Sequence, residues 1–360
     1  MLPAIAILAF AALGTVASSS AAEAEIWISS DCDNHITFDG VFTDTVKEAL
    51  RRINAWCNTA SAALTSFDDD RVKSVTKMIL GENDLDEKKA QALDRINAIG
   101  SLAGRVSPLP SQISIKLWWT VAREWDVTIY CELANILKHD AIRNEWTDSA
   151  QGFKWKSNDM IVKALDPKSG YLMLTAAQRA DEPHRDEMYN RRPEYIAFSA
   201  GYLEVLTRLE YGGGLRPADA IEKVKTYDRP GLQKLINELN ARDGKQILED
   251  KYINHIDALR TFEAILLHED KYINHIDALR TFEAILLHEL GHTFVGGHLD
   301  HEKGAKAGWN SVGKAEFPAA NPEILANLVM AIQLVIDHNQ IVNKEGNLSD
   351  GIEGAGPRTS

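Results

Sequence analysis

The chain has 360 residues, of which 45% are hydrophobic and 25% are charged. These fractions are typical of a soluble globular protein, and they exclude a fibrous, low-complexity or wholly disordered chain. The 39 basic and 52 acidic residues give a formal net charge of −13. A chain with this excess of acidic residues lacks the basic surface that attracts nucleic acids and anionic membranes. We therefore expect it to bind neither.

The first 22 residues have the pattern of a secretory signal peptide. The apolar run Ile5–Val16 is too short to span a bilayer, and small residues follow it. We therefore expect residues 1–22 to be removed and the mature protein to be secreted to the extracellular space. In an oxidising compartment two of the three cysteines would pair, and the sequence does not choose the pair. The candidates are Cys32, Cys57 and Cys131.

In the first half of the chain, apolar residues at spacings of three and four predict helices over 43–66 and within 68–99. Residues 105–115 are rich in Pro and Ser and predict a loop. The aromatic and apolar stretch 116–137 fits either a strand or a buried helix, because its periodicity does not decide between them. The polar region 146–194 predicts loops with short strands.

In the second half, residues 194–206 predict a strand that leads into a helix, and residues 217–240 predict one or two helices. The last helix has a clear start. Asn321 is a favourable N-cap residue, and Pro322 suits the first helical position. We expect this helix to end near His338.

One segment of the chain occurs twice. Residues 249–268 and 269–288 both read EDKYINHIDALRTFEAILLH. Two copies are too few for a repeat architecture, so we interpret the duplication as a recent insertion or a sequence-assembly error. The expected fold is a single α+β domain over residues 23–345, mostly α-helical, followed by a loose tail over residues 346–360.

Residues 288–292 read HELGH, which is an HExxH motif. Residues four apart share one face of a helix, so His288 and His292 can hold one Zn²⁺ ion. Glu289 would then act as general base toward a water on the metal. The eleven residues before the motif have the apolar spacing of a core-facing helix, as this chemistry requires. In the first copy of the repeat Tyr272 stands at the place of the second histidine, so only the second copy completes the motif.

Zinc needs a third protein ligand. His298 lies ten residues after His288, as in the metzincin motif HExxHxxGxxH. That motif has Gly three residues after its second histidine, whereas this chain has Val295, and a β-branched residue resists the left-handed turn required there. Asp300 is a second candidate. Glu323 is a third, although its position in the first turn of a helix is already explained by the helix dipole.

Residues 288–304, HELGHTFVGGHLDHEKG, resemble the aspzincins, the family of deuterolysin and the fungal peptidyl-Lys metalloendopeptidases. The family pattern continues HExxH with GTxxDxxYG, and Gly296, Asp300 and Gly304 match it. The resemblance implies a zincin-like fold with the motif on a central helix. It also implies that Asp300 is the third zinc ligand, and that the protein is an endopeptidase with a preference for basic side chains.

Two positions depart from the family pattern. Gly297 stands in place of Thr, and Lys303 stands in place of the Tyr that the family has near the substrate oxyanion. A Lys ammonium group can itself stabilise a developing oxyanion.

We therefore expect a secreted, monomeric zinc endopeptidase that acts on proteins or peptides, with Zn²⁺ held by His288, His292 and Asp300. Glu289 is the expected general base. Two alternatives stay open. One is a secreted zinc-binding protein with weakened catalysis that acts as a binder or effector, and the other is a metzincin-like peptidase that uses His298 as third ligand.

Overall fold

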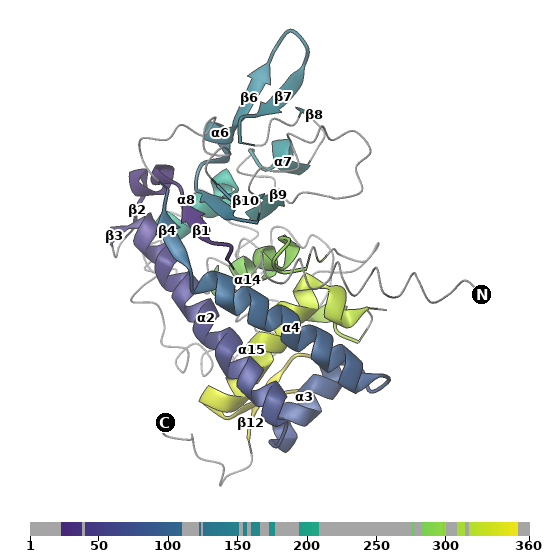
Figure 1. Cartoon of the computed structure of the whole chain (residues 1–360). Coiled ribbons are helices and arrows are strands. Elements are labelled where there is room, and N and C mark those ends of the chain that lie inside the picture. The colour runs from purple at the N-terminus through teal and green to yellow at the C-terminus, as the bar shows by residue number, and fades with distance from the viewer. Residues whose placement is uncertain are drawn as a thin grey trace, which may run out of the picture.

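The protein is a mixed α+β structure in which a β-rich part lies over a bundle of long helices (Figure 1). The computed structural model describes residues 23–37, 40–109, 122–123, 125–150, 154–156, 160–165, 173–176, 194–208, 276, 282–297, 299, 308–313 and 317–351. The α-helices are α2 (Phe42–Ser66), α3 (Asp70–Leu80), α4 (Leu85–Ala103), α6 (Leu133–Ile136), α7 (Met160–Lys163), α8 (Ala200–Arg208), α14 (Phe282–His292) and α15 (Pro322–His338).

A five-stranded sheet forms the centre of the β-rich part, in the order β4-β1-β5-β10-β9. The bounds of these strands are β1 (Ile26–Ile28), β4 (Val106–Pro108), β5 (Val127–Tyr130), β9 (Met173–Ala176) and β10 (Glu194–Phe198). The first four strands of this order are parallel, and β9 pairs with β10 in the antiparallel direction. All residues of β5 and β10 are buried, as expected of strands in the middle of a parallel sheet. Strand β9 is therefore the antiparallel edge of the sheet.

Smaller hairpins complete the β structure. They are formed by β2 (Ile36–Thr37) with β3 (Gly40–Val41), by β6 (Leu137–Asp140), β7 (Glu145–Asp148) and β8 (Lys154–Lys156), and by β11 (Gln340–Val342) with β12 (Leu348–Asp350). The second strand of this last hairpin, β12, lies within residues 346–360, which we expected to be a loose tail. Leu348 in this strand has a buried side chain that belongs to the main hydrophobic core.

Helices α2, α3 and α4 follow the periodicity of the sequence, and this prediction is confirmed. The apolar residues of α2 recur at spacings of three and four, and they are buried along one face. Helices α2 and α4 approach closely where Gly100 faces Cys57, since a Cβ atom on Gly100 would lie 2.7 Å from the Cβ of Cys57. Asp69 caps α3 by accepting a hydrogen bond from the backbone N–H of Arg71.

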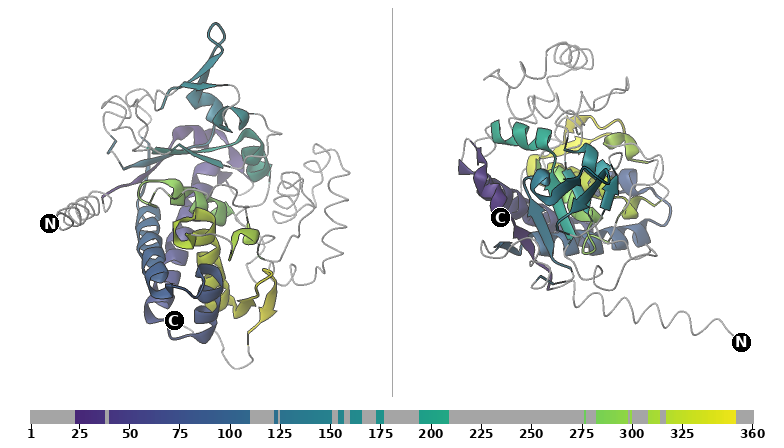
Figure 2. Two further views of the ribbon diagram at one scale, coloured as in Figure 1. Left: turned by 90° about the vertical axis from the view of Figure 1, so that its right-hand side faces the viewer. Right: turned by 90° about the horizontal axis from the view of Figure 1, so that it is seen from above.

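Helix α14 occupies the middle of the molecule. Each residue from Phe282 to Gly291 is buried, and a helix that is covered on all sides belongs in a core rather than on a surface. It packs against α2, α4, α15 and the edge strand β9 (Figure 2). Gly291 allows the close contact with α15, because a Cβ atom there would lie 2.9 Å from the Cβ of Pro322.

Most other elements agree with the sequence where the structure describes them. Strand β10 leads into α8 as predicted, and the ambiguous stretch 116–137 contains strand β5. Helix α15 begins after the N-cap Asn321 and ends at His338, as predicted. The expectation of a loop over 105–115 is wrong at Val106–Pro108, because these residues pair with β1 as the outer strand of the sheet.

Cys32 and Cys131 form a disulfide, and Cys57 is free and buried. The bridge joins the turn after β1 to the residue after β5, and it is compatible with an oxidising compartment without showing secretion. Within the described ranges, no helix is both long and apolar enough to cross a membrane. The expected signal peptide, the first copy of the repeat and the predicted helices over 217–240 lie outside the described residues.

Candidate metal centre

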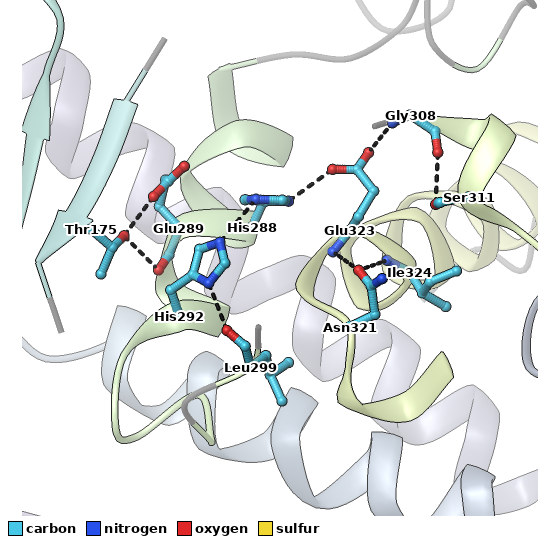
Figure 3. A network of polar contacts seen from close by, with 10 residues as sticks. All are labelled: Thr175, His288, Glu289, His292, Leu299, Gly308, Ser311, Asn321, Glu323 and Ile324. Carbon is cyan, nitrogen blue, oxygen red and sulfur yellow. Dashed lines mark hydrogen bonds and ion pairs between the residues drawn. The ribbon is translucent and has the colours of Figure 1, made fainter. Parts of the chain in front are cut away.

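Helix α14 brings the two motif histidines together. His288 and His292 are one turn apart on the helix, and their Nε2 atoms face each other at 3.2 Å (Figure 3). The two rings are inclined at 74° with centroids 5.0 Å apart. His288 is only 7% exposed. The sequence prediction that these two side chains converge is therefore consistent with the geometry of α14.

The opposite ring nitrogens are held by acceptors. The Nδ1 atom of His292 lies 2.6 Å from the carbonyl oxygen of Leu299, and the Nδ1 atom of His288 lies 2.8 Å from Oε2 of Glu323. The contact to Glu323 is electrostatic rather than an aligned hydrogen bond. An oxygen this close disfavours a lone pair on Nδ1, so in a neutral imidazole these contacts favour the tautomer with the proton on Nδ1. Both Nε2 atoms then carry a lone pair.

In these tautomers two lone pairs face each other at 3.2 Å, and a cation bound between them would relieve their repulsion. Zinc–nitrogen bonds of about 2.0–2.1 Å at a tetrahedral angle separate the two nitrogens by about 3.3 Å. Ligand histidines in zinc sites commonly donate their other N–H group to a carboxylate or a backbone carbonyl. The histidine pair therefore fits a zinc ion in both its spacing and its outer contacts.

Glu289 points toward the edge of the sheet. The Thr175 hydroxyl group lies 2.5 Å from Oε2 of Glu289 and 3.0 Å from its backbone carbonyl oxygen (Figure 3). Thr175 belongs to β9, so the edge strand orients this carboxylate. Glu289 is 8% exposed, which makes a hydrogen-bond donor at its carboxylate necessary. The sequence contains no signal for Thr175, because it lies 114 residues away.

Glu323 has a different role from the one that the helix dipole explained. It lies in the first turn of α15 and is 1% exposed, so its charge is buried. Its Oε1 atom accepts a hydrogen bond of 2.9 Å from the backbone N–H of Gly308, and its Oε2 atom contacts His288. This contact is to Nδ1, the ring nitrogen opposite the one that faces His292. The arrangement therefore does not favour Glu323 as a ligand of a metal on Nε2.

The turn after the motif brings the chain back to the end of α14. The backbone N–H of Leu299 donates to the carbonyl oxygen of Gly291 at 3.0 Å, and the carbonyl oxygen of Leu299 contacts His292. Gly297 has a φ angle of 99°, and a Cβ atom on Gly296 would lie 2.1 Å from the carbonyl oxygen of Leu290. The chain turns at these two glycines, and the left-handed φ of Gly297 favours a residue without a Cβ atom at that position.

The side chain that completes the centre is not fixed by the described residues. His298 and Asp300 flank Leu299, but they lie outside the described part of the chain, as does Lys303. In the part that the structure describes, no group of three or more His, Cys, Asp or Glu side chains is placed to hold a metal ion. The choice between His298 and Asp300 stays a prediction.

Backbone and side-chain contacts fix the end of α14 from the sheet side. Oε2 of the buried Glu194 accepts a hydrogen bond of 2.7 Å from the backbone N–H of Phe294. The Phe294 ring stacks on Trp125 with centroids 3.6 Å apart. These contacts tie the turn after His292 to strand β10 and to the segment before β5.

Compared with known proteins, the chain matches no family model, no curated protein and no solved structure.

Proposed function

We propose that this chain is a secreted zinc-dependent endopeptidase of the aspzincin type. The observation that carries the proposal is the pair of Nε2 atoms 3.2 Å apart, with each Nδ1 atom against an oxygen. The position of the motif on a buried central helix supports it, because a zincin-like fold needs the motif there. The disulfide between Cys32 and Cys131 is compatible with the proposed extracellular location.

In the proposed mechanism His288, His292 and Asp300 would hold Zn²⁺. The bound metal would supply a Lewis acid that acidifies a water and polarises the scissile carbonyl. Glu289 takes the proton of the attacking water and passes it to the leaving amine. The Thr175 hydroxyl group holds the Glu289 carboxylate in one orientation while this proton is transferred. Substrates are proteins or peptides, with a preference for basic side chains inferred from the resemblance alone.

The direct test is cleavage of a denatured protein by the purified chain with added Zn²⁺. We expect cleavage by the wild type and loss of cleavage by Glu289→Ala, since a general base contributes about 10²–10⁴-fold. Glu283→Gln is the matched control. Glu283 is another buried glutamate of α14, but its carboxylate pairs with Arg52 at 3.1 Å. Equal cleavage by the wild type and Glu289→Ala would refute the peptidase proposal.

A non-enzymatic function is the second candidate. Lys303 in place of the family's Tyr motivates it, because that Tyr lies near the substrate oxyanion in the family pattern. In this case the chain would bind one Zn²⁺ ion and act as a secreted binder or effector. One-to-one zinc binding without cleavage of any denatured substrate would favour this candidate over the peptidase.

A further inference from the structure

We propose that Glu323 is a positioning residue, which fixes the proton of His288 on Nδ1 and so keeps Nε2 available for a metal. The role of this proton position in zinc binding rests on the proposed function. The proton position itself does not depend on the proposed function, because it follows from contacts within the chain. Glu323 acts through His288 and does not itself touch a metal or a substrate.

The contact is buried on both sides. His288 is 7% exposed and Glu323 is 1% exposed, and Oε2 of Glu323 lies 2.8 Å from Nδ1 of His288. In the other neutral form of the ring, a lone pair on Nδ1 would face the carboxylate at this distance with little water to screen the repulsion. The carboxylate therefore selects the form with the proton on Nδ1.

The Glu323 carboxylate is itself held in place. Its Oε1 atom accepts from the backbone N–H of Gly308 at 2.9 Å, and its own backbone N–H donates to the Asn321 side chain at 2.9 Å. The N-terminus of α15 adds a favourable dipole for a buried anion. Pro322 packs against Gly291 of α14, so the two helices cannot separate without loss of this contact. The carboxylate is thus fixed relative to the histidine by the packing of α15 on α14.

The same geometry gives Glu323 of α15 a role that Glu283, a buried glutamate of α14, lacks. Glu283 pairs with the guanidinium group of Arg52, which also contacts Glu48. Removal of the Glu283 carboxylate would leave both histidines unchanged. Removal of the Glu323 carboxylate would leave Nδ1 of His288 without the charge that selects its proton. Contacts of this kind outside the metal ligands change metal affinity by about 10–100-fold.

The test compares Glu323→Leu with Glu283→Leu in the full mature chain. The first measurement is the ¹⁵N spectrum of the histidine rings in metal-free protein at pH 8, with the His288 signals assigned by their loss in His288→Gln. We expect the wild type and Glu283→Leu to show the proton of His288 on Nδ1, and Glu323→Leu to show a shift toward Nε2. A wild-type spectrum with the proton on Nε2 would overturn the proposal, whether or not any variant folds.

The second measurement is the zinc dissociation constant, determined by competition with a chelator, together with a thermal unfolding curve for each variant. We expect Glu323→Leu to weaken zinc binding by about 10–100-fold and Glu283→Leu to change it by less than about threefold. A folded Glu323→Leu with wild-type zinc affinity and an unchanged ring spectrum would refute the positioning role. If Glu323→Leu does not fold, Glu323→Gln replaces it, because its one carbonyl oxygen cannot serve both Gly308 and His288. A wild-type chain without zinc affinity would refute the proposed function, whereas the ring spectrum would still test the positioning of the proton.

Discussion

The hydrogen bond between Thr175 and Glu289 predicts a measurable loss when the hydroxyl group is removed. Thr175→Val keeps the shape of the side chain and replaces the hydroxyl group with a methyl group. A hydrogen bond to a charged group contributes about 1.5–3 kcal/mol, and a buried carboxylate that loses its donor is destabilised by a similar amount. Thr175 is half-buried, so water replaces part of the bond, and we expect a loss of about 1.5 kcal/mol in the free energy of unfolding.

Urea unfolding of the metal-free chain measures this loss without any assumption about catalysis. Thr175→Ser keeps the hydroxyl group and is the matched control. The loss should shrink when Glu289 is replaced by Gln, since the charge is then absent, and the double-mutant cycle should give a coupling of about 1 kcal/mol. In the cleavage assay we expect Thr175→Val to lower kcat about tenfold through a less ordered general base. A coupling near zero, with Thr175→Val as stable as Thr175→Ser, would refute the role of Thr175.

Three further predictions concern the third ligand, the cap of α3 and the free cysteine. Asp300→Ala should abolish tight zinc binding while His298→Ala should not, as measured by chelator competition, and the reverse result would assign the ligand to His298. A hydrogen bond from Arg71 lowers the pKa of Asp69 to about 2, so its stabilisation is complete above the ordinary pKa near 3.8 and is lost as the pH falls toward 2. The free energy of unfolding of the wild type should therefore fall between pH 4 and pH 2, and in Asp69→Asn this fall should be smaller by about 1–2 kcal/mol. Burial raises the pKa of Cys57 to about 12, so a thiol reagent should label it at pH 8 only after unfolding, and rapid labelling of the folded chain would contradict its burial.

The parts of the fold that the sequence predicts are those whose signals are local. The apolar spacing within 43–66, the N-cap Asn321 and the strand–helix pattern of 194–206 each depend on neighbours within one or two turns. The outer strand Val106–Pro108 was missed because its structure comes from pairing with β1. In this pairing Val106 lies opposite Ile26, which is 80 residues earlier in the chain. A three-residue strand has too few residues to show its own alternation.

The candidate site divides in the same way. The two histidines and Glu289 are four or fewer residues apart on one helix, so the motif alone predicts their arrangement. Thr175 comes from a strand 114 residues away, and Glu323 comes from the next helix, so only tertiary packing brings them to the motif. A glutamate in the first turn of a helix is favoured by the helix dipole. The sequence therefore offers no separate reason to expect a contact between Glu323 and His288.

The packing around α14 also explains why the two copies of the repeat are not equivalent. Both copies continue with Glu, but the next residues after the first copy are Asp270 and Lys271, at the positions of Leu290 and Gly291. Leu290 is fully buried, so an aspartate there would bring an unpaired charge into the core. Any side chain at Gly291 would meet the ring of Pro322, since a Cβ atom there lies 2.9 Å from it. The packing around α14 therefore fits the copy that continues into the complete motif. The same packing holds Glu323 against His288.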